Sequence, residues 1–361
     1  MPDTKLEHYP VIGPLPQPTQ EHLVLLYNPH ATNGNGRHKE IQELLGMERW
    51  SSCAIVKTLP ENELTIDALA KTLGHLDTYA NIGDEVTIVA VGGDGTQDNG
   101  SQAIREAKLS RVKAKLAAAK AGNKSDTAFN LGTDGCSLRE LIELGRPVEV
   151  FPLQVTVAAE GGKPIVRETM HSAGGGASGL VSADVNKPGF RKGNWLSEAG
   201  VVWRAIRRAR RKPVELVDNN IGMENGPLTD FIIGAGRRIA GGAIRFSRSS
   251  LADPERMSMA LSRRSWLSIL GGLAARLAGK GPGYHEVDGG AIQLTFRGLE
   301  QIEIGGEIIQ TQQRPNKEQL VTVSVQRAAP VTALVMDPKA VRPSKPKKSW
   351  FGSRSPAPAT A

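Results

Sequence analysis

One glycine-rich turn carries the residues of this sequence best suited to phosphate chemistry. Gly92, Gly93, Asp94, Gly95 and Thr96 follow the apolar run 86–91 without a gap. Successive backbone N–H groups in such a turn form a concave site for phosphate, and a helix that starts behind it adds partial positive charge. Glycines also let the main chain approach a nucleotide without a Cβ clash. Because Asp94 alone would repel phosphate, we expect Mg²⁺, water or a ribose hydroxyl between them, with Thr96 donating to a phosphate oxygen.

Two further turns have a similar composition. Asn28, Thr32 and Gly34 belong to the turn NPHATNGNG, and Thr133 belongs to the turn LGTDG. A single turn of this kind is usually an ordinary strand-to-helix connection, whereas three at the ends of successive strands favour a nucleotide site. The sequence lacks the GxxxxGK[ST] motif of P-loop proteins, and no GxGxxG follows the first strand.

Apolar strands alternate with amphipathic helices through the first half of the chain. We predict strands over 22–29, 53–59 and 85–93, helices over 33–45, 61–80 and 101–121, and a fourth strand with its turn over 126–135. Continuous apolar strands between helices are typical of a doubly wound parallel sheet that is covered on both faces. Ligands bind beyond the carboxyl ends of such strands, which is where the glycine-rich turns fall. The fold class is therefore α/β in this half.

The pattern changes near residue 151, where short strands separated by turns predict a mainly antiparallel β-sandwich domain. Helices are expected to interrupt it over 197–212 and 262–280. In the first of these helices the apolar stripe is assigned to Ala199, Val202, Ile206 and Ala209, with arginines around the rest of the helix. The predicted domains are a mobile leader at 1–20, an α/β nucleotide-binding domain at 21–150, a β-rich lipid or substrate domain at 151–336 and a disordered basic tail at 337–361. Whether the last strands return to the first domain is left open.

Charge and composition limit the cellular setting. The net charge of the 361 residues is +8, and it is concentrated in segments 187–212 and 339–361. Both segments would attract an anionic membrane surface, although a solvated face is an equal alternative. Two cysteines form no disulfide framework, and the start of the chain lacks a signal-peptide pattern. We therefore expect a cytoplasmic protein, with peripheral contact at the inner membrane surface, no nucleic-acid partner and a homodimer as an open alternative.

The order of these motifs resembles the diacylglycerol kinase-like catalytic family, which includes bacterial lipid kinases, sphingosine kinases and ceramide kinases. The resemblance extends over about residues 22–336 and rests on YNPHATNGNG, VAVGGDGTQDNG, FNLGTDGCSLRELI, SAGGGASGLVSADV, FIIGAGRRIAGG and SLADPERMSM. It implies an ATP- and Mg²⁺-dependent kinase of a lipid hydroxyl, with its active site between two domains. By this resemblance the residues that hold ATP and its magnesium are Asn28, Thr32, Gly92, Gly93, Asp94, Gly95, Thr96 and Thr133. Asp253 corresponds to an acid in a structural Mg²⁺ site, although Pro254 replaces the usual glycine.

Three departures from the family pattern affect positions that the family uses for chemistry. Gly135 and Cys136 are aligned with the Asn-Asp of the third turn, and Ala235 replaces the Asn of an Asn-Gly pair. Gly305 stands in EIGGEII where the family has the aspartate that accepts the proton of the lipid hydroxyl, which leaves Glu307 as a substitute base. Two alternatives therefore accompany the lipid kinase: a catalytically impaired nucleotide- or lipid-binding protein, and a kinase of a soluble acceptor.

Overall fold

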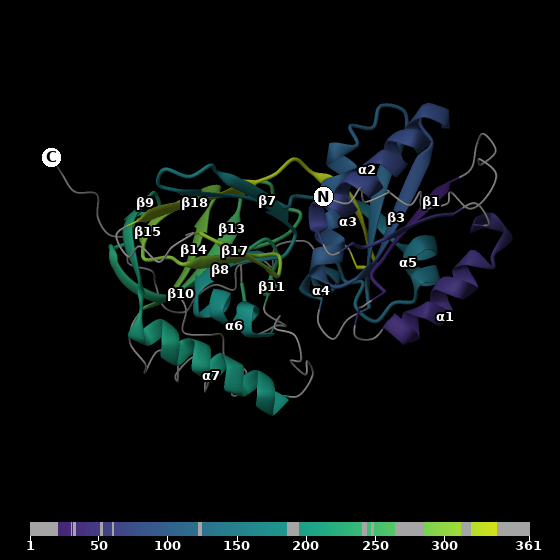
Figure 1. Cartoon of the computed structure of the whole chain (residues 1–361). Helices are drawn as coiled ribbons and strands as arrows, with labels where there is room; N and C mark the ends of the chain where they lie inside the picture. Colours follow the sequence, from purple (N-terminus) through teal and green to yellow (C-terminus); the bar gives the residue numbers. More distant parts are fainter. Residues whose placement is uncertain are drawn as a thin grey trace, which may run out of the picture.

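The chain forms two lobes, each built around one sheet, in a computed structural model (Figure 1). The structure describes residues 21–29, 31, 34–50, 53–59, 61–121, 125–185, 195–239, 244–246, 249–263, 285–311 and 319–337. The predicted leader at 1–20 lies outside these residues, as does nearly all of the predicted tail and of the helix predicted over 262–280.

The first lobe contains a six-stranded sheet in the order β2-β1-β3-β4-β19-β5. Its strands are β1 His22–Tyr27, β2 Ala54–Lys57, β3 Glu85–Gly92, β4 Lys113–Lys120, β5 Arg146–Val150 and β19 Val331–Val335. Strands β2, β1, β3, β4 and β19 pair in parallel, and β5 pairs with β19 in antiparallel orientation. The predicted α/β class of this half is confirmed.

Helices cover both faces of this sheet, and alternate residues of its strands pack against the helices on opposite faces. The helices are α1 Gly34–Leu45, α2 Asn62–Tyr79, α3 Asp94–Glu106, α4 Asp126–Asn130 and α5 Leu138–Leu144, with a 3₁₀ turn at Glu48–Trp50. Ile88 packs in the same cluster as Leu69 of α2, whereas Val89 packs with Ile41 of α1 and Leu141 of α5. Burial on both faces explains why β1 and β3 are almost uninterrupted apolar runs.

The predicted helix over 101–121 and the predicted strand over 126–135 are both wrong. Helix α3 ends at Glu106, the segment Lys113–Lys120 is strand β4, and Asp126–Asn130 is the short helix α4. Alanines favour helices intrinsically, yet tertiary packing overrides that preference here. A Cβ added to Gly100 of α3 would lie 2.9 Å from Leu116 Cδ1, so the helix and the strand approach closely. The small alanines of β4 suit a central strand that is packed this tightly.

The second lobe is an eleven-stranded sheet whose strand pairs in the described residues are all antiparallel. The main path runs β17-β16-β8-β10-β9-β15-β18-β6-β7, and β13 and β14 branch from β10. The strands are β6 Leu153–Ala159, β7 Ile165–Thr169, β8 Ser172–Gly176, β9 Val214–Asn219, β10 Gly226–Gly234, β13 Met257–Arg263, β14 His285–Gly289, β15 Ala291–Arg297, β16 Gln301–Ile304, β17 Glu307–Gln310 and β18 Leu320–Arg327. A separate small ribbon pairs β11 Arg238–Ile239 with β12 Ile244–Arg245. The predicted β-rich second half is confirmed.

Two helices, α6 Ala177–Val185 and α7 Trp195–Arg211, flank this sheet (Figure 1). The buried stripe of α7 is Val201, Ala205 and Ala209, whereas Val202 is 41% exposed and Trp203 is 57% exposed. Of the predicted stripe, Ala209 is buried and Ile206 is half-buried, whereas the assignment of Val202 is wrong. No helix in the described part of the chain is long and apolar enough to cross a membrane.

The chain crosses between the lobes twice, from β5 to β6 and from β18 to β19. The Ala328 N–H donates to the Pro152 carbonyl at 2.8 Å, so the two crossings lie side by side. The buried Arg327 guanidinium donates to the carbonyls of Phe151 at 2.6 Å and Ser250 at 2.7 Å. Burial lowers the pKa of Arg327 to about 10, which leaves it charged at neutral pH. One side chain thus fixes the junction through backbone oxygens.

Candidate functional site

The glycine-rich turns meet at one edge of the parallel sheet. The Asn28 N–H, just after β1, donates to the Val91 carbonyl at 3.1 Å, and the Ala121 N–H, just after β4, donates to the Gly92 carbonyl at 3.0 Å. These backbone bonds align the carboxyl ends of β1, β3 and β4. Helix α3 begins at Asp94, two residues after β3 ends, and its N-terminus therefore faces the same edge.

Close packing requires glycine at one position of this turn, and the space beside the next glycine is open. A Cβ on Gly92 would collide with the buried Thr96 side chain. Gly93, the N-cap of α3, instead faces open space, since no described atom outside its own neighbourhood lies within 4 Å of an added Cβ. At Gly95 the nearest such atom is the Gly305 carbonyl oxygen, at 3.9 Å. The first N–H groups of a helix lack partners within the helix, so this open space suits an anion.

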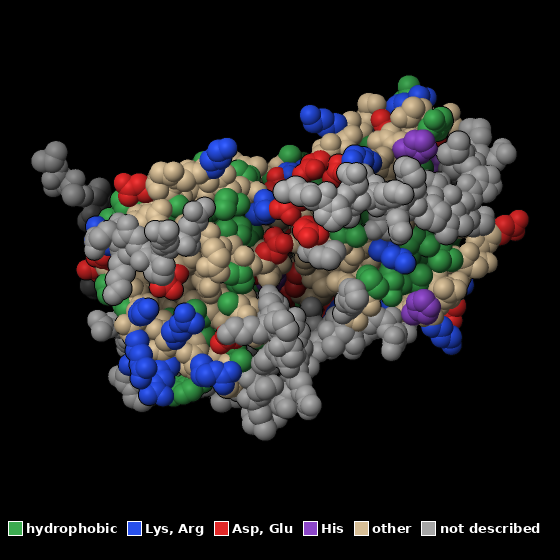
Figure 2. Space-filling view, viewed as in Figure 1, with side chains coloured by type: hydrophobic (Ala, Val, Ile, Leu, Met, Phe, Trp, Pro, Cys, Tyr) green, Lys and Arg blue, Asp and Glu red, His purple; other side chains and the backbone are tan. Residues whose placement is uncertain are grey.

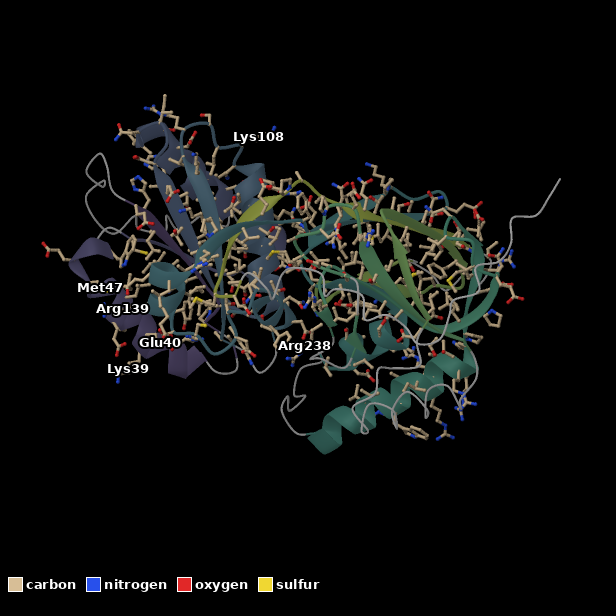
Figure 3. All side chains as sticks on the ribbon, turned by 180° about the vertical axis from the view of Figure 1, so that it is seen from behind. Lys39, Glu40, Met47, Lys108, Arg139 and Arg238 are labelled. Atoms are coloured by element: carbon tan, nitrogen blue, oxygen red, sulfur yellow. The ribbon has the colours of Figure 1, made fainter. Side chains whose placement is uncertain are left out.

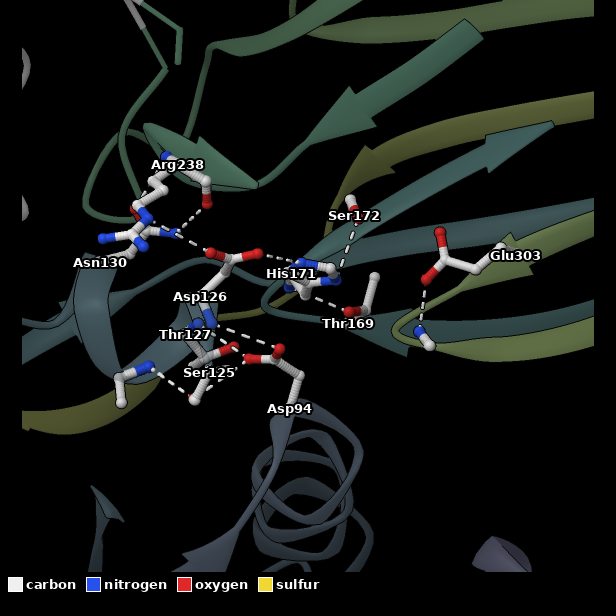
Figure 4. A network of polar contacts seen from close by, with 12 residues as sticks. Asp94, Ser125, Asp126, Thr127, Asn130, Thr169, His171, Ser172, Arg238 and Glu303 are labelled. Atoms are coloured by element: carbon white, nitrogen blue, oxygen red, sulfur yellow. Dashed lines mark hydrogen bonds and ion pairs between the residues drawn. The ribbon is translucent and has the colours of Figure 1, made fainter. Parts of the chain in front are cut away.

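The Asp94 carboxylate is held by the start of α4 (Figure 4). The Thr127 N–H donates to Asp94 Oδ1 at 2.9 Å, the Asp126 N–H donates to Oδ2 at 3.3 Å, and the Ser125 hydroxyl donates to Oδ1 at 3.3 Å. Ser125 also caps α4 by accepting the Ala128 N–H. The turn after β4 therefore fixes the acid of the turn after β3.

A buried histidine joins this carboxylate to the second lobe. His171 lies between β7 and β8, and its Nε2 is 3.0 Å from Asp126 Oδ2. Burial alone would lower the pKa of His171, but the nearby carboxylates of Asp94, Asp126 and Glu303 outweigh burial and raise it to about 10. His171 is therefore an imidazolium at neutral pH, and Arg238 adds a second cation, with its Nε 3.6 Å from Asp126 Oδ1. Figure 3 shows Arg238 from behind, between the two lobes.

Two buried carboxyl groups near this network have raised pKa values. Burial raises the pKa of Glu303 on β16 to about 7, although His171 and the Gly306 N–H oppose the rise. Burial likewise raises the pKa of Asp98 on α3 to about 7, against hydrogen bonds from the Thr169 hydroxyl and the Met170 N–H. Both carboxyls can exchange a proton near neutral pH, a property that is common in active sites.

Asp94, Asp126 and His171 are close enough to share a metal ion. One ligand atom from each lies within 4.8 Å of the others, and within the described residues this is the only such group of His, Cys, Asp or Glu. Carboxylate oxygens are the ligands that Mg²⁺ prefers, so Asp94 and Asp126 fit this ion. The Nε2 of His171 already contacts Asp126, which makes His171 a group that orients a ligand and balances its charge.

The remaining predicted nucleotide residues lie in different settings. Gly34 begins α1, and Thr32 falls outside the described residues. The Thr133 side chain is buried and donates to the Ala118 carbonyl at 2.7 Å, so it braces the turn against β4. Asp253 lies in the loop before β13, where its carboxylate accepts N–H bonds from Glu255 and Arg256 within the same loop. The roles assigned to these residues stay predictions.

The third turn needs a correction. The acid next to Asp94 is Asp126, at the first turn after β4, whereas Gly135 and Cys136 come after α4 and belong to the following connection. The alignment of Gly135 and Cys136 with an Asn-Asp pair is therefore wrong for the space beside Asp94. Its cause is the misplaced strand, since a helix predicted over 101–121 hides the true end of β4. The predictions gave no site role to Asp98, Glu303 or His171. Only Asp98 had a usable signal, because Asp94 and Asp98 are four residues apart on one helix.

A pocket beside this network contains Gly305 and Glu307, the two positions that the sequence analysis connected with the catalytic base. It is lined by Asn62, Glu63, Ile66, Gly95, Asp98, Asn99, Gln102, Arg167, Glu168, Ile304, Gly305 and Glu307. These residues come from α2, α3, β7 and the turn between β16 and β17, so both lobes form the pocket. Acidic side chains gather on the surface between the lobes (Figure 2). Glu307 accepts a hydrogen bond from the Asn62 amide and lies 3.8 Å from Arg167 Nε.

Comparison with known proteins gives a fold. No family model matches the sequence, and no curated protein matches it. A Bacillus anthracis crystal structure described as a "putative diacylglycerol kinase" matches with a TM-score of 0.55 at 15% identity, over 88% of this chain and 98% of that chain. A second crystal structure of a diacylglycerol kinase from that organism matches with a TM-score of 0.54 at 14% identity, over 90% and 100%. This chain has the diacylglycerol kinase-like fold. At these identities the likeness establishes the fold alone.

Proposed function

We propose that this protein is an ATP-dependent kinase that phosphorylates the hydroxyl of a lipid. The observation that carries the proposal is the joining of Asp94 and Asp126 beside the open N-terminus of α3. Phosphoryl transfer depends mainly on positioning and on charge neutralisation. The N-terminus of α3 can position phosphate groups, and the two carboxylates can hold a cation that neutralises charge. The shared fold supports a kinase, and the pocket between the lobes supports an acceptor that enters from the second lobe.

In this proposal each group near the phosphates has a distinct task. The N–H groups at the start of α3, next to Gly93 and Gly95, bind the phosphates. Asp94 and Asp126 would hold a Mg²⁺ ion, which when bound would supply charge neutralisation at the transferred phosphoryl group. The His171 imidazolium keeps Asp126 oriented, and it limits the repulsion between clustered carboxylates before ATP arrives.

The proposal is tested by transfer of labelled γ-phosphate from ATP to diacylglycerol, sphingoid, ceramide and soluble acceptors. Asp94→Asn should abolish the product, whereas Asp67→Asn, on the exposed side of α2, should leave it unchanged. Labelling of no acceptor, together with retained binding of ATP or lipid, would favour the non-catalytic alternative. Labelling of a soluble acceptor alone would favour a kinase of soluble substrates.

Helix α7 supports contact with an anionic membrane as part of this proposal. Its outer side carries the exposed Trp203 and Val202 among exposed cations, namely Arg204, Arg207, Arg208, Arg210, Arg211 and the following Lys212. Figure 2 shows this cluster of basic side chains below the second lobe. Cationic helices with an exposed tryptophan bind anionic interfaces, with about 1 kcal/mol from each basic residue near the surface. The predicted contacts at 187–194 and 339–361 lie outside the described residues.

Vesicle sedimentation tests this surface. Trp203→Ser with Arg204→Glu and Arg208→Glu should lower binding to phosphatidylglycerol-containing vesicles more than tenfold, since two charge reversals remove several kcal/mol of attraction. Arg139→Glu, an exposed change on α5 in the other lobe (Figure 3), is the control. Equal losses in both proteins would reject α7 as the contact and would point to general electrostatics.

A further inference from the structure

The space beside Gly305 is occupied by a carboxylate from another part of the chain. Gly305 lies in the turn between β16 and β17, has a φ of +59°, and donates its N–H to the Ser172 carbonyl at 2.8 Å. A Cβ added to Gly305 would fall on Oδ2 of Asp98 and would lie 2.9 Å from Thr169 Oγ1. Asp98 makes the closest of these contacts, so it is the main obstacle to a side chain at residue 305, with Thr169 second.

Asp98 enters this space from the helix that begins at the phosphate turn. Asp94 and Asp98 are four residues apart on α3, so both side chains project from one side of the helix. Asp98 Oδ1 accepts the Met170 N–H at 2.8 Å, which fixes the carboxylate with Oδ2 toward Gly305. Asp98 and Gly305 line the pocket between the lobes, and the Gly305 carbonyl approaches Gly95 of the phosphate turn.

The other two acids near this turn are engaged elsewhere. Glu307 also lines the pocket, but it is held there by Asn62 and by Arg167, and its side chain is 41% exposed. Glu303 accepts the Gly306 N–H and interacts with His171, and it is not among the residues that line the pocket. The pocket also contains Glu63 and Glu168, which form ion pairs with Arg167 and Arg105. Asp98 is the pocket carboxylate that lies on the helix of the phosphate turn.

We propose that Asp98 is the general base of this kinase and supplies from α3 the carboxylate that is missing at residue 305. This inference rests on the proposed function. In the step, the acceptor oxygen forms a bond to the γ-phosphorus of ATP while its proton passes to Asp98 Oδ2. The bond between the γ-phosphorus and the bridging oxygen breaks, and ADP leaves with that electron pair. Asp98 then releases the proton to water, so the cycle needs no other reactant.

Exchange of the two positions tests this assignment. When activity is measured with the acceptor that the wild-type protein labels best, Asp98→Asn should lower kcat by about 10²- to 10⁴-fold. This is the usual contribution of a general base. Binding of a fluorescent ATP analogue should stay within about twofold, because Asp98 is placed beside the acceptor. Gly305→Asp alone should lower activity and melting temperature, since two carboxylates would compete for one space. Combining it with Asp98→Ala should recover at least tenfold over Asp98→Ala alone, because aspartate tolerates a positive φ better than most residues.

The outcomes of this experiment distinguish failure of the Asp98 assignment from failure of the kinase proposal. Active wild-type protein with an Asp98→Asn rate within threefold of wild type would overturn the assignment and leave the kinase proposal standing. A large loss in Glu307→Gln without one in Asp98→Asn would move the base to Glu307. Wild-type protein that labels no acceptor would overturn the kinase proposal, and this assignment with it. If Asp98→Asn folds poorly, the melting temperature reveals it, and the paired Asp98→Ala and Gly305→Asp change decides: recovery supports the base, and a folded pair without recovery overturns it.

Discussion

Replacing Glu303 by glutamine should change how the stability of the second lobe depends on pH. Burial on β16 raises the pKa of Glu303 from 4.5 to about 7. A raised folded pKa means that the protonated carboxyl contributes stability fully below pH 4.5, and that this contribution is lost as pH rises through about 7. At ~1.4 kcal/mol for each pH unit, the loss amounts to about 3 kcal/mol.

Glutamine keeps the shape of the protonated glutamate and cannot ionise. The unfolding free energy of Glu303→Gln should therefore rise by about 3 kcal/mol relative to wild type between pH 4 and pH 8. Urea unfolding in EDTA, followed by circular dichroism and tryptophan fluorescence at a fixed ionic strength, measures this difference. Glu149→Gln, an exposed change on β5, is the control and should show a constant difference.

Two results would refute the reasoning. A constant difference between Glu303→Gln and wild type across this pH range would show that burial does not govern the carboxyl. A difference that falls with pH would show that the ionised form is the stable one, and that the His171 imidazolium outweighs the cost of burial.

Three further predictions concern other parts of the molecule. Gly236→Ala should destabilise the protein by about 2–3 kcal/mol, because its Cβ would displace the Asn130 amide, whereas Gly74→Ala, in open space on α2, should be neutral or stabilising in thermal melts. Adding Mg²⁺ at pH 8 should raise the melting temperature of the metal-free protein and EDTA should reverse it; an unchanged melting temperature would count against the magnesium site. Iodoacetamide at pH 8 should modify Cys136 before Cys53 in peptide mapping, because Cys53 is buried and burial raises its pKa to about 12; equal rates in the folded protein would contradict that burial.

The phosphate turn could be predicted because its signal is local. An apolar strand followed by Gly92, Gly93, Asp94 and Gly95 is legible within ten residues, and the alternation of strands and helices gave the α/β class. Strand β4 could not be read in the same way, since its alanines and lysines have the composition of a helix. Its pairing with β3 and β19 and the packing of Leu116 against Gly100 are contacts between distant segments. Because the end of β4 was not predicted, the position of Asp126 beside Asp94 was not predicted either.

The second part of the site depends on contacts between distant segments. His171 meets Asp126 only because β8 of the second lobe reaches α4 of the first, and no spacing in the sequence encodes that meeting. The same holds for Asp98 and Gly305, which are paired in space by the turn between β16 and β17. A sequence shows that Gly305 lacks a carboxylate, and a structure shows which residue fills the space.

The position of β19 has a consequence for how the chain is made. This strand lies between β4 and β5 of the first sheet but is encoded after the whole second lobe. During synthesis β5 has no neighbouring strand to pair with until residues 331–335 leave the ribosome. The sheet of the first lobe is therefore completed last, although most of its strands are translated first. A fragment ending at residue 150 would expose an unpaired edge of β4 and should aggregate, whereas a chain cut after β19 retains every strand of the first sheet.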